Sequence, residues 1–220
     1  MKILSIETSG KSFSVAFFDG KRVKSEVFIS SGINHSEKLL PAIDKVLKKS
    51  SAKLKDIDRI AVSTGPGSFT GIRVALSCAK TFADQLDITV AAVDTLEVLK
   101  AGVKSAGAEV VPLIDALRGE VYRKGKNCGV EIVTIDRLLK DLKKIKGKII
   151  IVGSVAKLYE PAFKRALGNR LILQNDRYNY PRASVLALMA VNLKAKNYKD
   201  VEPVYIRKSW AEEKRQQLSS

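Results

Sequence analysis

Apolar runs and glycine-bearing turns alternate over residues 1–30. Residues 3–6 are apolar, residues 13–18 are aromatic and β-branched, and residues 23–29 alternate apolar with polar side chains. The Asp19-Gly20 pair between the second and third runs is a strong hairpin signal, because a two-residue turn between antiparallel strands needs positive φ angles. The pattern predicts a meander of three antiparallel strands.

Helical and strand-like segments follow in alternation. Residues 39–47 carry apolar side chains at helical spacing, opposite to lysines. Asn34 and Glu37 have the spacing of a capping box, so a helix is expected here, and it should either begin just before Pro41 or bend at it. Strands at 57–63 and 88–93 and a helix at 72–82 complete the order βββαβαβ within residues 1–95.

The rest of the chain contains the same kinds of segment in a less regular order. A helical segment at 96–100 precedes strand-like runs at 110–114, 130–134 and 149–152, and a final apolar helix covers 183–193. A meander that feeds alternating helices and strands predicts a mixed sheet covered on its faces. We therefore expect an α/β fold of two lobes, residues 1–95 and 96–220, with the second lobe reduced and its C-terminal segment packed back on the first.

Composition excludes several classes of protein. The 220 residues are 45% hydrophobic and 28% charged, which argues against disorder. There is no run of about 18 apolar residues, so no membrane span is expected, and charge and glycine interrupt the first ten residues too early for a signal peptide. The two cysteines are too few for a disulfide scaffold or a zinc cage. We expect a cytoplasmic protein that does not contact a membrane.

The formal net charge of +16 falls mostly in residues 96–220. Its densest part is residues 118–148, with ten basic and four acidic side chains. Within it, residues 136–148 have apolar positions at helical spacing and lysines around them, as in a solvated helix face. The alternative is a surface for RNA or an acidic partner. No aromatic residue lies between Arg123 and Lys148, and so base stacking finds no support there.

Two turns carry candidate chemistry. Glu7, Thr8 and Ser9 follow the first strand, and a carboxylate beside two hydroxyls suits either a magnesium–phosphate group or the turn alone. Asp115 and Arg118 occupy a similar turn in the second lobe. The two carboxylates would therefore hold similar places in two similar lobes.

The loop before the second helix is rich in glycine. Gly65 and Gly67 flank a proline, and Ser68 precedes the helix, which predicts either a strand-to-helix turn or an anion site at a helix N-terminus. It is not a Walker A loop, because no Gly-Lys-Ser/Thr follows. His35 fits a general base, but it has no nearby Cys nucleophile, and so capping or core packing is the favoured interpretation. Cys78 lies in an apolar helix and should be inert, and Cys128 lacks a partner.

Five motifs in chain order carry a resemblance to a known family. They are ILSIETS (3–9), NHSEKLLPAID (34–44), STGPGSFTGIRVALSCAK (63–80), DALRGEVY (115–122) and EPVYIRKSWAE (202–212). Together they span nearly the whole chain, which resembles the bacterial TsaB (YeaZ) family. That family belongs to the actin-like superfold of sugar kinases and Hsp70 ATPases (ASKHA, ribonuclease H-like), so the resemblance implies two actin-like lobes.

The resemblance also implies a function and partners. It implies a non-catalytic subunit needed to form threonylcarbamoyladenosine on tRNA next to the anticodon, pairing with the metal-binding transferase TsaD and helping to recruit the ATPase TsaE. A homodimer is implied when TsaD is absent, and tRNA contact is implied to be indirect or weak. TsaD holds its metal through two histidines at helical spacing, and this chain has only His35. No catalytic residue, metal site or tightly bound cofactor is therefore expected.

Two departures from the family pattern bear on nucleotide chemistry. Glu7 stands where the family usually has Asp, and Leu117 stands at the first Arg of the motif around Asp115. A longer carboxylate shifts any magnesium geometry, which argues against ATP hydrolysis by this chain alone. The expected remnant is a weak nucleotide or anion site formed by Glu7, Thr8, Ser9, Gly65, Gly67, Ser68, Asp115 and Arg118.

The partner face follows from the resemblance as well. Helices at 36–48 and 70–82 would dock TsaD or a second copy of the chain, because apolar patches suit a stable subunit interface. The implied interface residues are His35, Leu39, Leu40, Ile43, Leu47, Phe69, Ile72, Ala75, Leu76 and Ala79. Competing hypotheses are an actin-like ATPase or kinase acting alone through Glu7, Asp115 and the glycine loop, and a basic tRNA-binding module. A metal-dependent peptidase is weaker, because one histidine leaves no zinc set.

Overall fold

The structure, a computed structural model, describes residues 1–30, 35–125 and 129–206. The first half of the chain forms a five-stranded sheet in the order β3-β2-β1-β4-β5. Its antiparallel part is β1 (Ile3–Glu7), β2 (Phe13–Phe18) and β3 (Val23–Ile29), and β4 (Arg59–Ser63) and β5 (Thr89–Val93) continue it in parallel. The predicted three-stranded meander and the mixed sheet are confirmed.

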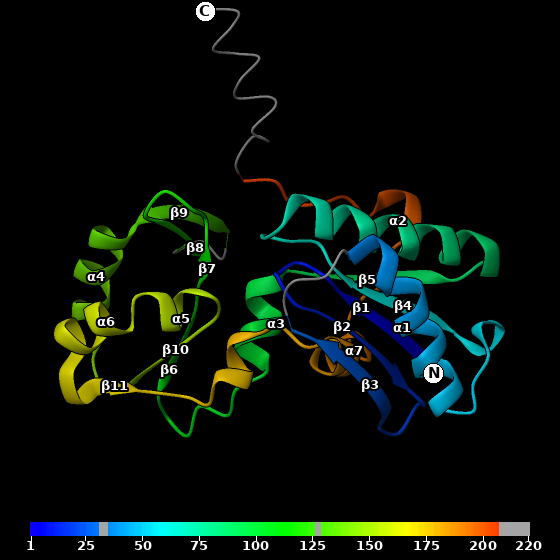
Figure 1. Ribbon diagram of the computed structural model, residues 1–220, viewed down its shortest axis with the longest axis horizontal. Helices are drawn as coiled ribbons and strands as arrows, with labels where there is room; N and C mark the ends of the chain where they lie inside the picture. The colour runs from blue at the N-terminus through cyan, green and yellow to red at the C-terminus, as the bar shows by residue number, and fades with distance from the viewer. Residues whose placement is uncertain (31–34, 126–128, 207–220) are drawn as a thin grey trace, which may run out of the picture.

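Helices cover both faces of this sheet (Figure 1). Helices α1 (His35–Lys49) and α2 (Phe69–Leu86) pack on the face that carries Leu4 and Ile6. The opposite face, which carries Ile3, packs against α7 (Ala183–Ala190). Successive side chains of a strand point to opposite faces, and so the unbroken apolar run of β1 is what burial on both sides requires.

The second half contains two three-stranded sheets. The antiparallel sheet is formed by β7 (Ile114–Asp115), β8 (Glu120–Lys124) and β9 (Val130–Thr134), and β6 (Glu109–Pro112) precedes it in the chain. β10 (Ile149–Val152) pairs in parallel with β6, and β11 (Leu171–Ile172) pairs in parallel with β10. The intervening helices are α4 (Ile135–Lys144), α5 (Val155–Leu158) and α6 (Glu160–Leu167). The strands of the second half are therefore divided between two small sheets.

Each half of the chain contributes one helix that packs on the other half. Helix α3 (Thr95–Ala101) follows β5, and its Leu99 packs against Val110 and Ile150 of the second half. Helix α7 follows β11, and its Leu186 packs against Ile3 of the first sheet. The C-terminal region thus returns to the first lobe, as Figure 1 shows for α7. The boundary proposed at residue 95 stays a prediction.

The helices are longer or shorter than the sequence suggests. Helix α1 runs from His35 through Pro41 to Lys49, so it begins well before the proline. Helix α2 includes both Phe69 and Leu86, while α7 ends at Ala190. Within residues 1–30, 35–125 and 129–206, no helix is long and apolar enough to cross a membrane.

Candidate functional site

The turn after β1 and the loop before α2 are in direct contact. The Ser68 amide donates to the Ser9 carbonyl oxygen at 2.7 Å, and the Thr8 hydroxyl donates to the Gly71 carbonyl oxygen at 2.6 Å. A Cβ atom added at Gly67 would lie 2.1 Å from the Ser9 oxygen, and one at Gly71 would lie 2.0 Å from the Thr8 oxygen. Glycine at these two positions is what lets the backbones approach so closely.

The Glu7 carboxylate ends β1 and is fully buried. Its Oε1 accepts hydrogen bonds from the Ser9 amide at 2.7 Å and the Ser9 hydroxyl at 2.5 Å, and its Oε2 accepts one from the Ser63 hydroxyl. Burial raises the pKa of Glu7, and the three donated hydrogen bonds offset only part of that shift. Donors of the chain itself therefore engage both carboxylate oxygens.

The glycine loop is enclosed by other parts of the chain. Ser68 caps α2 by accepting a hydrogen bond from the Gly71 amide. The Gly65 carbonyl oxygen accepts from the Thr95 amide at 2.8 Å, and a Cβ at Gly65 would lie 3.0 Å from the Val204 oxygen. The structure thus brings Glu7, Thr8, Ser9, Gly65, Gly67 and Ser68 together as one packed cluster, which we call the strand-end cluster.

Asp115 and Arg118 belong to the second lobe. The Asp115 amide donates to the Ser154 hydroxyl oxygen at 2.9 Å, and its Oδ1 accepts from the Leu117 amide at 2.9 Å. Leu117 and Arg118 have positive φ angles of 63° and 56°, as a tight turn requires. Asp115 ends β7 as Glu7 ends β1, so the expected similarity of place holds. In the described ranges, no three His, Cys, Asp or Glu side chains gather into a set that could hold a metal ion.

An ion-pair cluster joins β8 to the start of α3. Lys124 Nζ lies 3.0 Å from Asp94 Oδ2 and 3.2 Å from Glu97 Oε1. Burial alone would lower the pKa of Lys124, but hydrogen bonds and the charges of Asp94 and Glu97 outweigh it and raise the pKa. Asp94 also caps α3 by accepting from the Leu96 amide at 2.7 Å. The sequence pattern does not predict this link, because β8 does not follow the apolar pattern of a buried strand.

The residues of the implied partner face fall into two groups, one buried in the core and one at least partly exposed. Most of them pack against the first sheet, because helical spacing places them on the inner sides of α1 and α2. Small side chains there let α2 approach the sheet closely. These core residues, none more than 7% exposed, are Leu39, Ile43, Leu47, Ile72, Ala75, Leu76 and Ala79. This corrects the expectation that the whole set faces a partner.

The outer members of that set are few. Leu40 is 56% exposed on α1, and Phe69 is half-buried at the start of α2. The His35 side chain lies outside the described residues, as does Cys128. The interface itself stays a prediction, and Leu40 and Phe69 are the members that a partner can reach. Burial raises the pKa of the Cys78 thiol to about 11, in keeping with the expected inert cysteine.

The end of the described chain runs along α2, and we call residues 198–206 the C-terminal strap. Tyr198 donates a hydrogen bond to Asp84, and Lys80 pairs with Glu202 at 3.0 Å. At the other end, the Val204 amide donates to the Thr64 carbonyl oxygen at 2.8 Å. The strap also carries Tyr205, whose ring stacks on Phe69 with centroids 4.7 Å apart. The strap therefore ties the C-terminal motif to the strand-end cluster.

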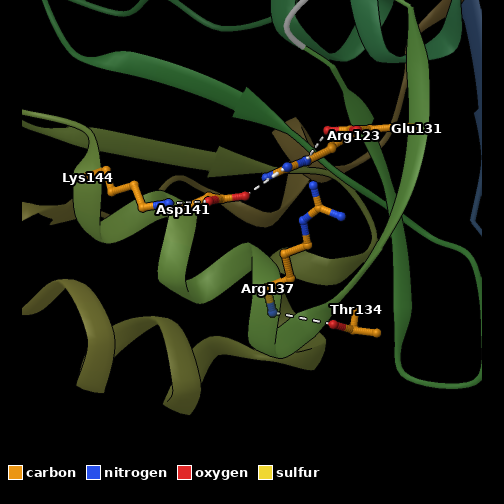
Figure 2. A network of polar contacts seen from close by, with 6 residues as sticks. All are labelled: Arg123, Glu131, Thr134, Arg137, Asp141 and Lys144. Carbon is orange, nitrogen blue, oxygen red and sulfur yellow. Dashed lines mark hydrogen bonds and ion pairs between the residues drawn. The ribbon is translucent and has the colours of Figure 1, made fainter.

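The densest basic run is partly neutralised. Arg123 pairs with Glu131 at 2.8 Å and with Asp141 at 2.9 Å, and Lys144 also pairs with Asp141 (Figure 2). Hydrogen bonds from Lys144 and Arg123 lower the pKa of Asp141 to about 2. At the start of α4, the Arg137 amide donates to the Thr134 hydroxyl oxygen at 3.4 Å, as Figure 2 also shows. Within the described residues, ion pairs therefore link β8 and β9 to α4 in this run, and this partial neutralisation favours the solvated interpretation.

Comparisons with known proteins agree with these observations. Residues 29–214 match the family described as "TsaD: tRNA N6-adenosine threonylcarbamoyltransferase". The chain is 32% identical to the tRNA threonylcarbamoyladenosine biosynthesis protein TsaB of Bacillus subtilis, with 97% of each chain covered. It is 27% identical to TsaB of Escherichia coli, with 96% of each covered.

Solved structures show the same fold. YeaZ from Pseudomonas aeruginosa matches with a TM-score of 0.72 and 23% identity, over 93% of this chain and 99% of that one. A protein of the same organism, described as uncharacterized and similar to peptidase YEAZ, matches with a TM-score of 0.75 and 23% identity over 94% and 99% of the two chains. Both likenesses support the expected fold of two lobes with mixed sheets.

Proposed function

Because the chain belongs to the TsaB family of tRNA threonylcarbamoyladenosine biosynthesis proteins, we propose that it acts as a non-catalytic scaffold subunit in that pathway. Its role is to pair with a TsaD-like transferase, to help recruit a TsaE-like ATPase, and so to support formation of the modified adenosine next to the anticodon. In the absence of TsaD, the same face pairs two copies of this chain.

The state of the strand-end cluster is the observation that supports a non-catalytic role. A phosphate-binding loop offers unpaired backbone amides, and a magnesium-binding carboxylate offers free oxygens. Here the Ser68 amide is bonded to Ser9, and both oxygens of Glu7 accept hydrogen bonds from serines. This packing disfavours an independent ATPase or kinase that would use Glu7. We propose that no cofactor is tightly bound and that any nucleotide binds weakly.

Similarity to transferases supports pairing with TsaD. The family match covers residues 29–214, and a tRNA N6-adenosine threonylcarbamoyltransferase of Persephonella marina is 33% identical over 37% of this chain. Two homologous chains can form a pseudo-symmetric pair through equivalent surfaces, as two identical chains do. The outer side of α1 and the start of α2, with Leu40 and Phe69, is the surface that we assign to this contact.

Co-purification with a TsaD-like partner tests the proposal. We expect Leu40→Glu to abolish co-elution, because a charge would be placed at the centre of an apolar contact. Leu158→Glu is the matched control, because Leu158 is 57% exposed but lies on α5 in the other lobe. We expect it to leave co-elution intact. Equal behaviour of the two variants would refute the assigned face.

Reconstituted modification tests the functional role. With TsaD-like and TsaE-like proteins, tRNA and the substrates of the reaction, threonylcarbamoyladenosine should form only when this chain is present, as measured by mass spectrometry of tRNA nucleosides. Titration calorimetry of the isolated chain with magnesium–ATP should show only weak binding and no turnover. Steady hydrolysis of ATP by the isolated chain would support the kinase-like alternative instead.

A further inference from the structure

A cavity of about 200 Å³ lies beside α3 and the start of α7. Its floor is apolar and includes Val98, Leu99 and Val185. Its polar lining comes from β3, from residues 177–182 before α7 and from the first turn of α7, and consists of Glu26, Arg177, Tyr178, Tyr180, Arg182 and Ser184. None of these residues belongs to the strand-end cluster or to the assigned partner face.

The opposite charges of Glu26 and Arg182 in the cavity wall neutralise each other. Arg182 forms a two-pronged ion pair with Glu26, with N···O distances of 2.7 and 3.2 Å, and its guanidinium lies 4.2 Å above the ring of Phe28. Glu26 also accepts a hydrogen bond from the Ser184 amide at 3.1 Å. These contacts hold the first turn of α7 in place, so we treat Glu26 and Arg182 as structural.

Arg177 is the uncompensated charge of the cavity. It is exposed, its guanidinium lies 4.7 Å from the centre of the Tyr178 ring, and its Nη2 donates to the Tyr178 hydroxyl at 2.6 Å. Within the part of the chain that the structure describes, no carboxylate pairs with it. Because Glu26 and Arg182 cancel, the cavity wall keeps one net positive charge that can attract an anion.

Two aromatic rings line the same space. Tyr178 and Tyr180 are both half-buried, and Tyr180 is held by an edge-to-face contact with Phe28 at 5.7 Å. Aromatic side chains beside an arginine are what proteins use to bind single-stranded nucleic acid, through base stacking and phosphate contacts. The run Arg-Tyr-Asn-Tyr-Pro-Arg at 177–182 supplies the interleaving of basic and aromatic residues that residues 123–148 lack.

We propose that this cavity binds one unstacked nucleotide of a single-stranded RNA, with the base against Tyr178 and Tyr180 and the adjoining phosphate on Arg177. A volume of about 200 Å³ is below the usual range for drug-sized ligands. We therefore place only the base inside and the ribose and phosphate at the mouth. The inference deepens the proposed function, on which it rests for the identity of the RNA, by naming the RNA contact of this subunit.

Fluorescence anisotropy with a labelled single-stranded oligoadenylate tests the site. Tyr178→Ala should weaken binding about tenfold, because one stacking platform is lost. Arg177→Ala should weaken binding about three- to tenfold. It should also lower the slope of log affinity against log salt concentration by about one, as expected for the loss of one phosphate contact. Tyr178→Phe keeps the ring and should stay within about twofold of the parent, the size of change expected when stacking is retained. Lys140→Ala removes an exposed charge of α4 and should change binding equally little.

The outcomes separate the site from a diffuse basic surface. If Tyr178→Ala binds as the parent does, or if Lys140→Ala weakens binding as much as Arg177→Ala, the nucleotide site is wrong. Competition with AMP distinguishes a free nucleotide from RNA as the ligand. If AMP displaces the oligomer at equal concentration, the cavity binds a free nucleotide. If AMP does not displace it, the cavity binds RNA. Circular dichroism melts confirm that each variant folds.

Failure of this site and failure of the proposed function give different results. RNA binding is measured on the isolated chain, whereas scaffold activity is measured by co-elution with a TsaD-like protein. Arg177→Ala and Tyr178→Ala should lose RNA affinity and keep co-elution, because the cavity lies apart from Leu40. A chain that binds RNA through the cavity but neither pairs nor supports modification would refute the scaffold role alone.

Discussion

The close packing of α2 against the strand-end cluster depends on the absence of a side chain at Gly71. Gly71 has an ordinary helical conformation in α2, so a side chain is not excluded by its backbone angles. Space is the constraint, because an added Cβ would lie 2.0 Å from the Thr8 carbonyl oxygen, well inside the contact distance. Only a backbone shift of α2 or of the turn could accommodate it.

Gly71→Ala should therefore destabilise the fold by about 1–3 kcal/mol, as overpacking typically does. Gly10→Ala is the matched control in the adjoining turn, because the nearest atom to its added Cβ is 3.8 Å away. In urea titrations, we expect the free energy of unfolding of that variant to lie within about 0.5 kcal/mol of the parent's, as is usual for tolerated substitutions. A Gly71→Ala protein as stable as the parent would show that α2 and the turn after β1 are not in such close contact.

The sequence could predict the members of the strand-end cluster but not its state. A carboxylate at a strand end and two glycines before a helix are visible as patterns around Glu7 and Gly67. That Ser9 and Ser63 engage the carboxylate depends on β1 and β4 lying side by side. Strand pairing across this distance is a tertiary fact, so the pattern alone left the magnesium–phosphate and turn hypotheses open.

At the scale of elements, apolar spacing predicts where the helices lie in the sequence, but it does not predict whether their apolar side faces the core or a partner. The stripe on α1 suits burial against a sheet and burial against a partner equally, and only the structure shows Leu39 inside and Leu40 outside. Strands 130–134 and 149–152 are confirmed at the predicted residues. The two-residue strand β11 and the charged strand β8 were missed, because neither has a recognisable period.

The C-terminal strap is an element held chiefly by side chains, and Tyr205 anchors its end. The ring stacks on Phe69 at an interplanar angle of 16°, and the Arg73 Nε donates to its hydroxyl at 2.7 Å. Tyr205→Ala should speed amide exchange at Val204 about three- to tenfold, because an aromatic pair contributes about 0.5–1.5 kcal/mol. Exchange measured by NMR at the Val204 amide, which donates to the Thr64 oxygen, reports this opening directly.

Tyr205→Phe separates the ring from the hydroxyl. It keeps the stack on Phe69 and loses only the hydrogen bond from Arg73, so we expect a smaller increase in exchange than with alanine. An alanine variant whose Val204 amide exchanges at the parent rate would mean that backbone contacts alone hold the strap. The strap would then be independent of the surface that we assign to the partner.

At the scale of the whole molecule, the two halves are interlocked by exchanged helices. Helix α7 comes from the second half and covers one face of the first sheet, while α3 comes from the first half and packs on the sheet of β6, β10 and β11. Neither sheet has both faces covered without the other half of the chain. The chain should therefore unfold as one cooperative unit, although Figure 1 shows two lobes.

Leu186→Ala in α7 tests this interlocking. Leu186 is fully buried against the first sheet, so we expect a loss of about 2–5 kcal/mol, the usual cost of a large cavity in a core. The loss should appear equally in the amide exchange of β2 and of β8, because unfolding the first sheet releases α3 from β6 and β10 and breaks the ion pair of Lys124 on β8 with Asp94. Leu188→Ala lies on the same helix but is 53% exposed, and it should change stability by less than about 0.5 kcal/mol. If Leu186→Ala weakens β2 and leaves β8 fully protected, each lobe is stable without the other, and the exchanged helices align two separate units rather than joining them.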